Sequence, residues 1–149
     1  MSTLVMGIGN LLLGDEGVGV HAVQALAQAG APPGVTYLDA GTAILDALPH
    51  LEAATRVVVV DAMQAGGPPG EVYVLPLEDC QAKESLASLH GFDLPRVLAL
   101  SRRRDTPPVT VVGVEPASLD WSLDLSPAVA RALPLVLNTV RQLLAGNLT

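Results

Sequence analysis

The chain has 149 residues, half of them apolar, and a formal net charge of −7. This is the size of one ordinary globular domain, so we expect residues 1–149 to form a single domain, and the acidic balance disfavours nucleic acid, whose phosphates need clustered Lys and Arg. A lone cysteine excludes an internal disulfide, and the sequence has neither the basic start of a signal peptide nor a membrane span, so we expect a cytoplasmic protein.

Strands and helices alternate in the first half of the chain. Residues 4–9 form a short apolar run closed by glycine, which predicts a buried strand, and apolar residues then recur at helical spacing over residues 18–26. A second strand is expected over residues 35–39, with Thr42 as the N-cap of the following helix. Residues 56–61 contain a run of valines without alternation, which is typical of a central parallel strand that helices cover on both faces.

This alternation breaks in the second half. Residues 66–70 are rich in glycine and proline and too few to contain a crossover helix, so the strand expected over residues 71–75 should be antiparallel to the others. Residues 76–92 show no firm period, whereas residues 109–114 predict a fifth strand. Residues 126–144 supply a serine N-cap, a first-turn proline and a long final helix. The chain is therefore predicted to be an α/β/α sandwich with a mostly parallel sheet.

Acidic residues follow three of the predicted strands. Asp39 closes the second strand, Asp61 closes the third, and Asp15 and Glu16 stand in the glycine-rich loop that leaves the first. Ligands of parallel sheets gather outside the carboxyl ends of the strands, and right-handed crossovers bring these three strands side by side. Any one of these acids alone is equally well explained as a helix cap or a solvated loop residue. Together, with no Lys or Arg in the adjacent loops, they would repel one another unless protonated or bridged by a cation, which indicates a metal.

A divalent transition metal usually takes an imidazole beside its carboxylates. His21 and His50 fall on predicted helices and are interpreted as surface residues. His90 stands in the irregular segment before a helix, and loops often carry ligands. On pattern alone a solvated loop histidine is the commoner case, so both interpretations of His90 stay open.

Other chemistries have weaker support in the sequence. Residues 7–9, Gly-Ile-Gly, begin a dinucleotide fingerprint, but Leu12 stands where its third glycine belongs. Asp39 could still hold a ribose, so a nucleotide-binding module of the NAD type is the alternative function. No G-x-S-x-G elbow of a serine hydrolase occurs, and only its place in an irregular segment suggests Cys80 as a nucleophile.

Short motifs along the chain resemble one known family. Residues 7–10, Gly-Ile-Gly-Asn, and 14–19, Gly-Asp-Glu-Gly-Val-Gly, are similar to the N-terminal signature of the maturation endopeptidases of nickel-iron hydrogenases. That signature is specific in combination. The later motifs are short and persuade through their order and spacing; they are residues 38–42, 60–62, 88–90, 113–116 and 125–127, so the similarity covers nearly the whole chain.

The resemblance implies a function, a fold and a set of site residues. Such an enzyme trims a C-terminal extension from a hydrogenase large-subunit precursor after nickel insertion, and the nickel delivered in the precursor is its recognition mark. By the family pattern, Glu16, Asp61 and His90 would contact that nickel. A separate hypothesis, from general chemistry and not from the resemblance, is that nickel polarises the scissile carbonyl or a water and that a free carboxylate such as Asp39 or Asp15 is the base. The implied fold is a five-stranded mixed sheet in the order 2-1-3-5-4 with strand four reversed. The precursor is the expected partner, and we expect a monomer.

Overall fold

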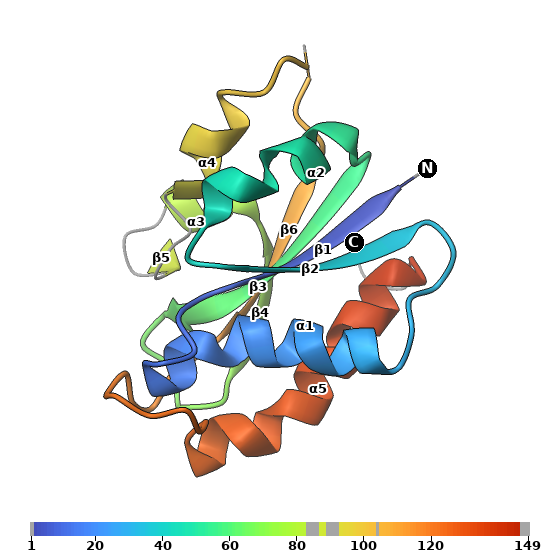
Figure 1. The fold of residues 1–149 in the computed structure, drawn as a ribbon. Coiled ribbons are helices and arrows are strands. Elements are labelled where there is room, and N and C mark those ends of the chain that lie inside the picture. The colour runs from blue at the N-terminus through green and yellow to red at the C-terminus, as the bar shows by residue number, and fades with distance from the viewer. Residues whose placement is uncertain (1, 83–86, 89–92, 104, 147–149) are drawn as a thin grey trace.

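A mixed β-sheet lies between two layers of helices in the computed structural model, which describes residues 2–82, 87–88, 93–103 and 105–146 (Figure 1). The strands are β1 (Thr3–Ile8), β2 (Val35–Gly41), β3 (Arg56–Gln64), β4 (Val72–Pro76), β5 (Ala87–Ser88) and β6 (Val109–Val114). The helices are α1 (Val18–Gln28), α2 (Leu48–Ala53), α3 (Leu77–Ala82), α4 (Asp93–Leu98) and α5 (Pro127–Leu144), with the 3-10 helices η1 (Gly14–Gly17) and η2 (Ile44–Ala47).

The strand order confirms the predicted topology. The main sheet runs β2-β1-β3-β6-β4, in which β6 is the strand predicted as the fifth. All neighbours are parallel except β4, which pairs antiparallel with β6 because the glycine- and proline-rich turn before it cannot contain a crossover helix. The short strand β5 pairs antiparallel with the end of β3.

Both faces of the sheet are covered. Helices α1 and α5 lie on one face, and α2, α3 and α4 lie on the other (Figure 1). Within β3, Val58 and Val60 belong to the core under α1 and α5, whereas Val57 and Val59 belong to the core on the opposite face. All four valines are buried, which explains why the strand shows no polar alternation.

Two local expectations were wrong. Thr42 is not a cap: Ala43 is the N-cap of η2 without a side-chain hydrogen bond, because a turn closed by its N–H on the Ala40 carbonyl delays the helix by one residue. Asp39 and Asp61 do not close their strands, since β2 and β3 continue by two and three residues beyond them. No element was predicted for residues 76–92, where helix α3 lies, because its six residues are too few to show a helical period. Ser126 is confirmed as an N-cap, and its hydroxyl accepts from the Val129 N–H.

Within the described part of the chain, no helix is both long and apolar enough to cross a membrane.

Candidate active site

Glycines bring η1 and the first turn of α1 directly onto the ends of β1 and β3. A Cβ on Gly9 would overlap the Glu16 carbonyl, and a Cβ on Gly19 would overlap the Val60 carbonyl. Gly9 also has a φ of +138°, a left-handed conformation that other residues rarely adopt. Because main chain contacts main chain at both points, the acidic pair after β1 is held against the carboxyl edge of the sheet, as the sequence predicted.

Glu16 and Asp61 meet this edge from two elements. Asp61 is fully buried on β3, opposite Gly113 of β6 and one residue beyond the last ladder pair between β1 and β3. Glu16 is half-buried in η1, with its carbonyl over Gly9. The structure therefore brings the backbones of these two predicted site residues to the same edge, around the end of β1.

Asp39 reaches this edge from the other side of β1. Gly7 pairs with both Asp39 on β2 and Val60 on β3, so the backbones of Asp39 and Asp61 are separated by two strand spacings, about 10 Å. The Asp39 side chain is exposed, and its Oδ2 lies 3.5 Å from Nε2 of Gln24 on α1. It borders a hollow of about 180 Å³, which Gly9, Asn10, Leu11, Val20, Gly41 and Thr42 also line. Of the three predicted site acids Glu16, Asp39 and Asp61, Asp39 is thus the one with an exposed side chain.

Asp15 has a different environment from its neighbour Glu16. Its carboxylate is 1% exposed and accepts four hydrogen bonds. Oδ2 accepts from the Ala117 N–H at 2.8 Å, the Ser118 N–H at 3.1 Å and the Ser126 hydroxyl at 2.8 Å, and Oδ1 accepts from the Ser126 N–H at 2.7 Å. The expectation that Asp15 offers a free carboxylate was therefore wrong: it ties the loop after β6 and the start of α5 to η1.

The histidines divide differently from the prediction. His50 is exposed as expected, but His21 is half-buried in α1. His90 lies outside the described residues. Within the described ranges, no three His, Cys, Asp or Glu side chains form a group suited to a metal ion. A metal set of Glu16, Asp61 and His90 therefore stays a prediction.

Comparison with known proteins gives the family of the chain. A family model described as hydrogenase maturation protease matches residues 20–143. The chain belongs to the hydrogenase maturation protease family. It is 37% identical over 152 aligned positions to the hydrogenase expression/formation protein HupD of Rhodobacter capsulatus, covering 97% of this chain and 72% of that protein. It is 34% identical over 145 positions to the hydrogenase 2 maturation protease of Escherichia coli K12, covering 94% of this chain and 88% of that protein.

Solved structures agree with this assignment. The hydrogenase maturating endopeptidase HybD from E. coli superposes with a TM-score of 0.85 at 33% identity, covering 98% of this chain and 93% of that one. The chain is an endopeptidase of this family, and its sheet order matches the one that the resemblance implied.

The first loop of this protease differs from a dinucleotide-binding turn. In that turn the glycines lead straight into a helix whose N-terminus holds the pyrophosphate. Here η1 intervenes and α1 begins only at Val18, ten residues after Ile8 ends β1. The structural context that a nucleotide-binding module needs is therefore absent from this described segment, and the alternative function loses its support.

Cys80 of the protease is unsuited to be a nucleophile. Its side chain is buried in α3, and burial raises the pKa of the Cys80 thiol to about 11, with the Asp79 and Asp61 carboxylates adding to the effect. The thiol is therefore protonated near neutral pH, where only a thiolate would attack.

One carboxylate near the site was not singled out from the sequence. Glu115 follows β6, is 6% exposed, and its Oε1 accepts from the Ala65 N–H at 2.9 Å, the Gly67 N–H at 3.0 Å and the Tyr73 hydroxyl at 2.9 Å. Burial and this bond to Glu115 raise the pKa of Tyr73. The sequence did contain a signal for Glu115: it directly follows a buried strand, which is the pattern that singled out the other acids. Its role is to fix the turn that leaves β3, the strand of Asp61.

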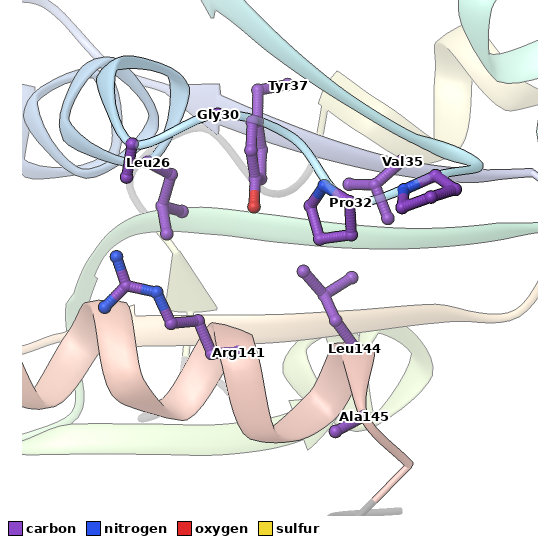
Figure 2. A pocket seen from close by; sticks show the side chains of 10 residues that line it. Leu26, Gly30, Pro32, Val35, Tyr37, Arg141, Leu144 and Ala145 are labelled. Carbon is purple, nitrogen blue, oxygen red and sulfur yellow. The ribbon is translucent and has the colours of Figure 1, made fainter.

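A second hollow lies away from these acids. It measures about 400 Å³, and its lining includes Leu26, Pro32, Val35, Tyr37, Arg141 and Leu144. Figure 2 shows the Tyr37 hydroxyl directed toward α5, which carries Arg141. Burial raises the pKa of Tyr37, which the Arg141 guanidinium partly offsets. Because Val35 begins β2, this hollow lies at the amino ends of the strands, opposite the acidic edge.

Proposed function

We propose that this endopeptidase removes the C-terminal extension from the large-subunit precursor of a nickel-iron hydrogenase after nickel has been inserted. The observation that carries the proposal is the likeness to the hydrogenase maturating endopeptidase from E. coli over nearly the whole of both chains. The acids at the carboxyl edge support it, because they lie where a parallel sheet binds its ligands.

The nickel in the precursor would be contacted by Glu16, Asp61 and His90. Two carboxylates and an imidazole form a ligand set that divalent transition metals accept. The pairing of β5 supports the inclusion of His90: Ala87 lies opposite Gln64 and Ser88 opposite Met63, so β5 runs back along β3 in the direction of Asp61. In this proposal nickel belongs to the substrate, and the enzyme recognises that the precursor is loaded.

Asp39 is the proposed base. Its exposed carboxylate borders the hollow beside the end of β1, where it can accept a proton from an attacking water or position the substrate. Nickel would supply polarisation of the scissile carbonyl or of the water. Asp15 takes no part in proton transfer, because four donors occupy its two oxygens.

Nickel-loaded and nickel-free precursors, incubated separately with the enzyme, test the function. The proposal expects cleavage of the loaded precursor only, read as the mass of the released peptide. Equal cleavage of both precursors would contradict nickel recognition, and no cleavage of either would contradict the function.

Conservative variants test the individual roles. Glu16→Gln, Asp61→Asn and His90→Gln should each weaken capture of the nickel-loaded precursor. Asp39→Asn should bind that precursor normally and cleave it about 10²-fold more slowly, a usual loss for a general base. Asp46→Asn, an exposed carboxylate on η2, is the control and should match the parent. If Asp39→Asn cleaves at the parental rate and is about 1 kcal/mol less stable, Asp39 only supports its turn.

A further inference from the structure

Three large apolar side chains stand exposed on two neighbouring loops. Trp121 is 78% exposed, Leu123 66% and Leu12 50%. The Ser122 N–H donates to the Leu12 carbonyl at 2.9 Å, so the residue between Trp121 and Leu123 is bonded directly to the loop of Leu12. We call these three residues the docking patch. Apolar side chains exposed together in this way are typical of surfaces that bind another molecule.

The docking patch rests on a fixed support. Besides the bond to Leu12, the Gly14 N–H donates to the Ser122 carbonyl at 2.9 Å and the Asp15 N–H to the Ser118 carbonyl at 3.1 Å. The buried Asp15 carboxylate holds the same loop at its two ends, through Ala117 and Ser126. Because the loop is already held in place, less conformational entropy is lost when a partner binds to its apolar side chains.

The docking patch is continuous with the candidate active site. Leu12 lies four residues before Glu16 in the segment that joins β1 to α1. In Figure 1 the loop between β6 and α5 runs beside this segment, at the carboxyl edge of the sheet. The docking patch and Glu16 are therefore carried by the same short segment at this edge.

The charges around the docking patch select the kind of partner. The exposed carboxylates of Asp120 and Asp124 flank Trp121 and Leu123 in sequence. The sequence contains no Lys or Arg in residues 1–55 or 105–130, which include both loops. An apolar surface with an acidic border favours a segment that carries apolar and basic side chains, and over the screening length of about 8 Å at physiological salt it repels an acidic one.

We infer that the docking patch binds an apolar, basic segment of the hydrogenase precursor outside the scissile bond, with Trp121 as its anchor. This inference rests on the proposed function and adds a specificity surface to it. Exposed aromatic residues on such surfaces often contribute most of the binding energy, and truncating them commonly weakens binding by tenfold or more.

Kinetics with nickel-loaded precursor test the docking patch. Trp121→Ala should raise KM by about tenfold or more with kcat nearly unchanged, because the anchor does not touch the reacting atoms. Leu135→Ala is the matched control, since Leu135 is 55% exposed on α5 and away from the docking patch; its KM should equal the parental value. Asp120→Asn with Asp124→Asn should reduce the salt dependence of KM. A parental KM in Trp121→Ala would overturn the inference.

A binding measurement separates this inference from the proposed function. Trp121 is the only tryptophan of the chain, so enzyme labelled with 5-fluorotryptophan has one ¹⁹F resonance, without any substitution. Adding the hydrogenase precursor should shift or broaden this resonance, and an added acidic protein of similar size should not. A shift without cleavage would support the docking patch and contradict the proposed function. Cleavage without a shift would overturn the docking patch and leave the function intact.

Discussion

Replacing Asp15 with alanine removes a carboxylate that accepts hydrogen bonds from four donors. Three of these donors are backbone N–H groups of the loop after β6 and of the cap of α5, and the fourth is the Ser126 hydroxyl. In the variant, these donors lose a partner that is itself 1% exposed, and because Ala117 and Ser118 are exposed residues, water replaces part of what is lost. The free energy of unfolding should therefore fall.

The size of the loss follows from the number of bonds and their shared acceptor. A hydrogen bond to a charged group contributes roughly 1.5–3 kcal/mol, but four bonds to one carboxylate do not add, and water can enter the space left by the side chain. We expect Asp15→Ala to lose about 2–4 kcal/mol. At about 2–4 °C per kcal/mol for a chain of this size, Tm should fall by roughly 5–15 °C.

Urea unfolding and calorimetry measure this loss. Asp120→Ala is the control, because Asp120 is an exposed carboxylate in the same loop, and its stability should stay within about 0.5 kcal/mol of the parent. Asp15→Asn should fall between the two, since an amide oxygen can replace Oδ2 while its NH₂ group faces the Ser126 N–H. If Asp15→Ala lost less than about 1 kcal/mol, Asp15 would not be the tie between these loops.

Three further outcomes are expected. Gly19→Ala should destabilise the fold by about 2 kcal/mol or more in urea unfolding, because its Cβ would overlap the Val60 carbonyl. Without that contact, alanine would instead stabilise helix α1 by up to about 1 kcal/mol, so a more stable variant would contradict the close approach of α1 to β3. Tyr73→Phe should lose about 1 kcal/mol of stability, since it removes one of three donors to Glu115, and an unchanged stability would contradict that role. Native Cys80 should react with iodoacetamide at pH 8 on the order of 10²-fold more slowly than in the unfolded chain, because its pKa is about 11, and equal rates would show that the thiol is accessible and ionised.

The sheet could be predicted because short sequence patterns mark its strands and general rules of strand pairing give their directions. A valine run without alternation marks a strand covered on both faces, and β3 has buried valines on each side. A turn too short for a helix forces an antiparallel neighbour, and β4 pairs with β6 in that way. The short elements were not predictable, because α3 has six residues and β5 has two, and pairing with β3 defines β5.

The sequence predicted the edge of the sheet at which the candidate site lies, but not the environment of each of its side chains. Register and right-handed crossovers bring the backbones of Asp39, Asp61 and Glu16 to the ends of neighbouring strands, which a pattern of strands and acids is enough to indicate. The sequence pattern did not indicate which acid would be buried. Asp61 is fully buried and Asp39 is exposed, although both are aspartates near the end of a strand. The difference lies in the sheet order: β3 is central and β2 is at the edge.

Asp15 and Glu16 show why adjacent acids could not be distinguished from the sequence. They are consecutive in a 3-10 helix, where three residues make a turn and successive side chains diverge by about 120°. One of them therefore turns into the protein and the other remains half-buried at the edge. Which one turns inward depends on donors supplied by residues 102 to 111 positions further along the chain, at the end of β6 and the start of α5. Four donors occupy the two oxygens of Asp15, so Glu16 is the acid of the pair that we propose contacts the substrate's nickel. Mutating Asp15 should therefore lower stability, whereas mutating Glu16 should weaken capture of the nickel-loaded precursor.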